Sequence, residues 1–186
     1  MFVPEFPPII PLMLASLLML FAGKTGLRVL SVAGPLGTLA WILALPVDQT
    51  RWSIDLLNHE WVLVEMTRIS RLFAASFAVF GVLGGIYAWS TGSLSKKIWP
   101  MQLTCGGVGV SLAGDWLSLF LSWEILAISS MFMVWHGVSR QSAAAGYRYA
   151  LFHIAGGVCL LAGAIWEEQF GDPYIGKIAL DNLGGY

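Results

Sequence analysis

The sequence predicts an all-α protein, a polytopic membrane helix bundle of about six transmembrane helices with both termini outside the cytoplasm. Three observations predict this class. Of 186 residues, 57% are hydrophobic and only 11% are charged, whereas about 25% of residues are charged in typical soluble domains. The mean hydropathy is +0.73. The 9 Trp and 21 Gly also fit a membrane protein, because Trp gathers at membrane interfaces and Gly is frequent in spanning helices.

The same composition excludes several classes of protein. So few charged residues cannot cover a water-facing surface, which excludes an ordinary soluble enzyme and a disordered tail. A formal net charge of −1 offers no basic field for a phosphate backbone, so we expect no nucleic-acid partner. Cys105 and Cys159 both lie in apolar runs and are expected to be packed thiols rather than a disulfide or a metal site.

Six apolar runs approach the roughly 20 residues that a spanning helix needs. The first is short and opens with several prolines, and its lack of a basic start argues against a signal peptide. Glycines weaken the fourth. We expect residues 1–186 to form one transmembrane domain. The runs are roughly 6–21, 27–45, 70–89, 98–113, 116–135 and 143–166.

Two segments between or after the runs are longer than turns. Residues 46–69 form an extracytoplasmic loop, in which Asn58-His59 between two apolar stretches is compatible with a small hairpin on the membrane surface. The tail from Glu167 to Tyr186 is polar and rich in glycine and contains no further span.

Charge is distributed unevenly between the two sides of the membrane. The loops after the first, third and fifth runs hold six of the ten basic residues and no acidic residue. The other side holds four basic and ten of the eleven acidic residues. Because Lys and Arg accumulate in cytoplasmic loops, both termini are expected outside the cytoplasm of a multi-pass cell (inner) membrane protein. The six basic residues are Lys24, Arg28, Lys96, Lys97, Arg140 and Arg148.

The remaining acidic residue, Glu124, lies inside the fifth run. It is eight residues after Trp116, or about 12 Å along a helix, which places it near the middle of the bilayer. A carboxylate at that depth costs about 2.5–3.5 kcal/mol, and such residues usually have a function. Burial favours the neutral acid and a nearby cation favours the carboxylate, so Glu124 is a candidate proton relay. The alternative is a protonated side chain that only hydrogen-bonds neighbouring helices.

Two residues of the sixth run are candidate neighbours of Glu124. If the fifth and sixth runs are antiparallel, His153 falls within about 8 Å of the same depth, and an imidazole can pass protons near neutral pH. Arg148 is a candidate charge partner, although a side chain that extends to the interface fits it better. Tyr149 is interpreted as an interfacial aromatic residue and Asp115 as the N-cap of the fifth helix.

The sequence gives little support for a nucleotide-binding, haem or metal site. No phosphate-binding loop and no dinucleotide-binding glycine pattern is present, and the spacing of the three His argues against a haem held by two of them within the bilayer. We therefore expect no cofactor and no metal. An intact quinone or haem redox subunit stays open as a further hypothesis, which a haem absorption band would favour.

Two strings carry a resemblance to a known family: GDWLSLFLSWEILAISSMFMVWHG around Glu124, and AAAGYRYALFHIAGGVCLLAGAIW around His153. They resemble the antiporter-like proton-translocating subunits of respiratory complex I, and most of all the D subunit of Mrp-type cation/proton antiporters. TRISRLFAASFAVFGVLGGIYAWS is a weaker match, because this chain has Arg68 and Arg71 where the family usually carries an acidic residue.

The resemblance implies a function and its partners. Glu124 would be the first member of an ion-pair relay that moves H⁺, with or without exchange for Na⁺, in a multisubunit antiporter or a complex I-like NADH:quinone oxidoreductase. Family members have further spans, one of which supplies a lysine facing this glutamate. We therefore expect the lipid bilayer and other membrane subunits as partners, including a chain or segment that supplies the missing spans. Such a subunit translocates ions without catalysing a reaction of its own. The alternative is a structural or assembly subunit that transports nothing.

Overall fold

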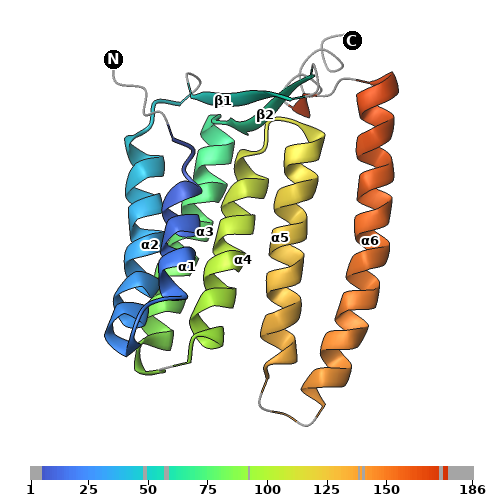
Figure 1. The fold of residues 1–186 in the computed structure, drawn as a ribbon. Helices are drawn as coiled ribbons and strands as arrows, with labels where there is room; N and C mark the ends of the chain where they lie inside the picture. Colours follow the sequence, from blue (N-terminus) through green and yellow to red (C-terminus); the bar gives the residue numbers. More distant parts are fainter. Residues whose placement is uncertain are drawn as a thin grey trace.

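A computed structural model describes residues 6–47, 50–56, 59–91, 93–137, 139, 141–171 and 174–175. Six α-helices run alternately up and down in this part of the chain, and a two-stranded sheet lies across one end of them (Figure 1). We call this end the hairpin end and the opposite one the loop end. The helices are α1 (Ile10–Met19), α2 (Lys24–Ala44), α3 (Arg68–Tyr87), α4 (Ser95–Leu112), α5 (Trp116–Trp135) and α6 (Ser142–Phe170). A short 3₁₀ helix, η1 (Ala88–Ser90), follows α3.

The mostly helical fold agrees with the prediction, and the structure adjusts the predicted spans. Four helices are long and apolar enough to cross a membrane, namely α2, α3 with η1, α5 and α6. The helix α1 has only 10 residues, with a proline in its first turn. The helix α4 has 18 residues but begins with Ser95, Lys96 and Lys97, which lower its hydropathy. The helix α5 has the predicted bounds, and α6 is four residues longer than predicted at its C-terminal end.

The loop between α2 and α3 contains an antiparallel hairpin, as predicted. Strand β1 (Arg51–Leu56) pairs with β2 (His59–Glu65) from Arg51↔Glu65 to Leu56↔His59. His59, predicted to lie in the turn, is the first residue of β2, and residues 57–58 lie outside the described residues. In β2, Val62 and Val64 are fully buried and alternate with more exposed neighbours. This period of two is that of a strand with one face packed on the helix ends.

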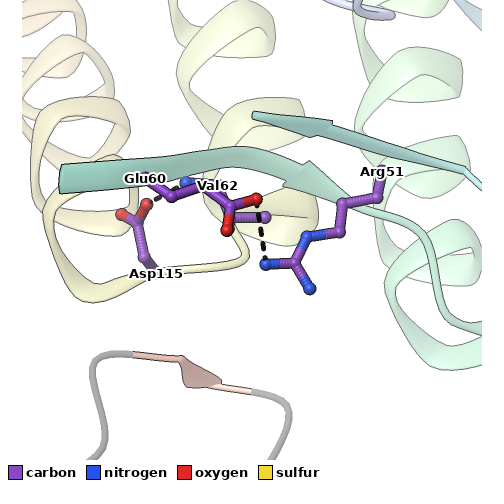
Figure 2. Close-up of polar contacts among 4 residues, drawn as sticks. All are labelled: Arg51, Glu60, Val62 and Asp115. Carbon is purple, nitrogen blue, oxygen red and sulfur yellow. Dashed lines mark hydrogen bonds and ion pairs between the residues drawn. The ribbon is translucent and has the colours of Figure 1, made fainter. Parts of the chain in front are cut away.

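Asp115 joins the hairpin to the start of α5. Its Oδ1 accepts a hydrogen bond of 2.6 Å from Ser118 N, so it is the N-cap, as predicted. Its Oδ2 accepts a second bond from the backbone N–H of Val62 in β2 (Figure 2). Gly114 N also donates to Val62 O at 3.1 Å. Asp115 is 3% exposed, and it therefore fixes the hairpin on the helix bundle from a buried position.

The helices α1 to α4 share one apolar core, whereas α5 packs on α4 and α6 packs on α5 (Figure 1). The core is built largely from α1, α2 and α4, with small residues such as Ala74 and Ala78 from α3. The outer face of α6 stays apolar and exposed, with Phe152 at 82%, Ile154 at 63% and Val158 at 62%. Cys105 is buried in the core, but Cys159 on α6 is exposed, so the prediction of a packed thiol is wrong there.

Lys97 does not lie in a loop, as the distribution of charges had predicted. The sequence reading placed it in a loop, but it lies in the first turn of α4 and is only 2% exposed. Its Nζ donates to Ala88 O at 2.6 Å and to Ser31 Oγ at 3.5 Å. A buried ammonium needs such acceptors, and here η1 supplies the Ala88 carbonyl, which also accepts a hydrogen bond of 3.1 Å from Thr91 N.

Candidate functional site

Glu124 lies at the contact between α5 and α6. It is the ninth residue of α5, about 12 Å along the helix from Trp116, and its side chain is partly buried. Its Oε1 atom lies 2.7 Å from the point where a Cβ on Gly157 would be. The carboxylate therefore occupies space that exists only because residue 157 has no side chain, and the backbone of α6 forms one wall of the site.

The carboxylate of Glu124 has no partner among the described residues. It forms no hydrogen bond and no ion pair with any of them. Among the described residues, the ion pair that the structure contains joins Arg51 to Glu60 on the hairpin. A carboxyl group partly removed from water is costly unless it meets a hydrogen-bonding or charged partner. The described part of the chain thus presents a proton-binding group whose counter-charge it does not provide.

His153 lies one helical turn before Gly157, on the face of α6 that meets α5. Its ring stacks on Trp123, the residue preceding Glu124, with 5.6 Å between centroids. The Nε2 atom is buried and has no hydrogen-bond partner in the structure. The structure therefore brings His153 to the same interface as Glu124 and leaves its Nε2 atom without a hydrogen-bond partner.

Tyr149, interpreted from the sequence as an interfacial aromatic residue, continues this line toward the loop end. Its ring stacks on His153 at 5.9 Å between centroids, and its hydroxyl is 2.8 Å from Ser130 Oγ on α5. Residues 149, 153 and 157 are spaced by four and so share one face of a helix, a signal that was present in the sequence. We call Glu124, His153, Tyr149 and Ser130 the α5–α6 row.

Arg148 is not brought to Glu124. It lies nine residues before Gly157, which is two and a half helical turns and hence the opposite side of α6. Its side chain is exposed. This position near the loop end suits a side chain that extends to the membrane interface.

The described residues contain no group of three or more His, Cys, Asp or Glu side chains that could hold a metal ion. The chemistry of this site therefore rests on a carboxylate, an imidazole and two hydroxyls, all of which can bind or pass a proton.

Comparison with known proteins places the chain among membrane subunits. No protein-family model matches the sequence. In an alignment of 151 positions that covers 75% of the chain, it is 25% identical to NAD(P)H-quinone oxidoreductase chain 4 1 of Synechococcus sp. (strain JA-2-3B'a(2-13)). The chain is a partial homologue of this antiporter-like subunit.

A solved structure shares the fold. A chain in the structure of the membrane-bound sulfane sulfur reductase (MBS), an archaeal respiratory membrane complex, matches 90% of this chain with a TM-score of 0.72 and 24% sequence identity. The similarity covers 28% of the cyanobacterial protein and 28% of the archaeal chain. The chain thus spans little more than a quarter of the length of these relatives.

Proposed function

We propose that the chain is a proton-translocating membrane subunit in which Glu124 binds and releases the transported proton. It would work within a multisubunit antiporter or a complex I-like NADH:quinone oxidoreductase of the cell membrane. The observation that carries this proposal is a partly buried carboxylate, deep in an apolar helix, that has no counter-charge among the described residues. The similarity to chain 4 of NAD(P)H-quinone oxidoreductase supports the same assignment.

The physical basis is the competition between two states of the carboxyl group. Low dielectric favours the neutral acid, and an approaching cation favours the carboxylate. A change of about 2.7 kcal/mol in their relative free energy shifts protonation about 100-fold. That is close to the ~2.3 kcal/mol needed to move one charge through 100 mV. The cation would come from another subunit or segment, and its movement would load and unload Glu124 without a cofactor.

The α5–α6 row supplies a route to Glu124 from the loop end. Tyr149 and Ser130 are linked at 2.8 Å, and His153 lies between Tyr149 and the level of Gly157. Hydroxyls and imidazoles both donate and accept hydrogen bonds, so together with intervening water they can transfer protons. We place proton entry from the cytoplasm at this end, where the basic residues gather. Exchange of H⁺ for Na⁺ at the same carboxylate is part of the proposal, and comparing rates with and without Na⁺ tests it.

Gly157→Ala tests the position of the carboxylate. The new Cβ would meet Oε1 of Glu124 at 2.7 Å, so the side chain must move, and we expect transport to fall roughly 10- to 100-fold. Gly156→Ala is the matched control, since a Cβ there has nothing within 4 Å. Proton uptake into proteoliposomes containing the purified complex measures both variants. Equal rates for Gly157→Ala and Gly156→Ala would contradict the assigned site.

Tyr149→Phe tests the route along the row. The substitution keeps the ring on His153 and removes the hydroxyl bonded to Ser130, so we expect proton uptake to slow by roughly tenfold. Tyr147→Phe is the control, because Tyr147 is 60% exposed and lies off the row. If the two tyrosine variants pump at the same rate, protons reach Glu124 by another path.

A structural or assembly role is the second candidate. The position of the Glu124 carboxyl group beside the α6 backbone at Gly157 favours it, because a protonated carboxyl group there could link the two helices. Under this alternative the buried glutamate only links helices. Substitutions of Glu124 that differ in hydrogen bonding separate the two candidates, as set out in the Discussion.

A further inference from the structure

Basic side chains gather at the loop end of the bundle. The element order brings together there the start of α2, the start of α4 and the first turns of α6 (Figure 1). Among the described residues, no acidic side chain lies at this end. The basic residues there are Lys24, Arg28, Lys96, Lys97 and Arg148.

None of these cations has an anionic partner among the described residues, and Lys96 and Arg28 also lack other acceptors. Lys96 is exposed at the loop end and forms no hydrogen bond or ion pair with a described residue. On the neighbouring helix α2, the Nε atom of Arg28 is buried and has no acceptor in the structure. Lys97 differs from both, because Ala88 and Ser31 occupy its ammonium. The buried Nε atom of Arg28 and the unpaired charges around it point to an anion from outside the described chain.

An apolar groove begins beside Lys96. It lies between α3 and α4, has a volume of about 350 Å³, and is floored by Met133 of α5. It adjoins a small cavity lined by Lys96 and Lys97, and both hollows share Gly81, Gly84 and Pro100. The remaining walls of the groove are Phe77, Phe80, Leu103 and Thr104.

Two details explain why the groove is open and apolar. A Cβ on Gly84 would meet nothing within 4 Å, so the missing side chain leaves free space beside α4. The hydroxyl of Thr104 is already bonded to Pro100 O at 3.0 Å, so it offers little to a polar ligand. Gly84 lies one helical turn from the end of α3. The groove therefore runs through the half of the bilayer nearest the basic end.

We propose that this groove binds an anionic glycerophospholipid, with one acyl chain between α3 and α4 and its phosphate at Lys96. The combination of a carbon-lined groove and basic side chains at headgroup depth matches the two chemical parts of such a lipid. Charge complementarity selects an anionic headgroup over a zwitterionic one, because the loop end offers several cations and no described acid. The inference does not depend on proton transport by Glu124.

The test uses the purified protein with the subunits that accompany it, in detergent. Native mass spectrometry would count lipids retained after titration with dioleoyl phosphatidylglycerol or, in parallel, with dioleoyl phosphatidylcholine. Gly84→Leu fills the groove, Lys96→Gln removes the charge, and Gly156→Leu is the matched control on another open glycine. Inorganic phosphate added as a competitor distinguishes a phosphate site from a lipid site.

We expect one tightly retained phosphatidylglycerol, weaker binding of phosphatidylcholine, and no effect of inorganic phosphate. Lys96→Gln should weaken phosphatidylglycerol binding about fivefold, as expected for one basic side chain near a headgroup. Gly84→Leu should abolish retention, and Gly156→Leu should not. Equal retention of the two lipids, or full retention by Gly84→Leu, would overturn the proposal. If Gly84→Leu does not fold, two comparisons still test the proposal: phosphatidylglycerol against phosphatidylcholine, and the unmodified protein against Lys96→Gln.

Discussion

Glu124→Gln is expected to reduce proton translocation at least 100-fold while the protein still inserts and assembles. Glutamine has the same shape and can hydrogen-bond, but it cannot lose or gain a proton in this range of pH. The space beside Gly157 accepts an amide as well as a carboxyl group, so the packing of α5 on α6 should be unchanged. Proton uptake by proteoliposomes, driven by the substrate or ion gradient of the complex, measures the effect.

Two further variants are needed to interpret this result, one as a control and one to separate the two candidate functions. Glu60→Gln is the control, because Glu60 is exposed and pairs with Arg51 at 3.4 Å on the hairpin, and its loss should leave transport unchanged. Glu124→Leu removes both the charge and the hydrogen bonding. Under the structural alternative, Glu124→Gln pumps normally and Glu124→Leu lowers the yield of complex. Normal pumping by Glu124→Gln would therefore exclude the proton-relay role.

Asp115→Ala is expected to destabilise the folded protein by about 2–4 kcal/mol. The loss of an N-cap costs about 0.5–2 kcal/mol, and a buried N–H left without an acceptor, here that of Val62, costs about 1–3 kcal/mol. The structure contains both bonds, one donated by Ser118 N and one donated by Val62 N, and Figure 2 shows the second. Unfolding by SDS in mixed micelles measures the change in the free energy of unfolding.

The two oxygens of Asp115 bind different donors, which makes a second variant informative. Asp115→Asn keeps one acceptor oxygen, but its amide nitrogen cannot accept a hydrogen bond. We therefore expect it to destabilise the protein by about half as much as Asp115→Ala. Asp55→Ala is the control, because Asp55 on β1 is exposed and should change stability by less than about 0.5 kcal/mol. An Asp115→Ala protein as stable as the Asp55→Ala protein would mean that the hairpin is held by other contacts.

Most of the fold could be predicted from hydropathy, because each apolar run needs a helix to satisfy its backbone in a bilayer. Both ends of α5 were predicted, and Asp115 explains its start as an N-cap. The start of α4 was not predicted. A lysine normally marks a loop, but Lys97 finds acceptors in Ala88 and Ser31, and these contacts depend on how three helices meet.

The candidate site was predictable only in part. Glu124 stands out because a carboxylate in an apolar helix is costly wherever the helix packs. The roles of Gly157 and Tyr149 depend on which face of α6 meets α5, and hydropathy gives no such register because α6 is apolar nearly all round. For the same reason Arg148, close to His153 in sequence, was a reasonable partner for Glu124 but lies on the opposite side of α6.

The central claim is that the Glu124 carboxyl group changes its protonation state during turnover. Infrared difference spectroscopy of the active complex detects this change directly, through the C=O stretching band of a protonated carboxylic acid. We expect a band in this region that appears or shifts during turnover and is missing in Glu124→Gln. Difference spectra identical in the two proteins would show that Glu124 keeps one protonation state, and would contradict the account.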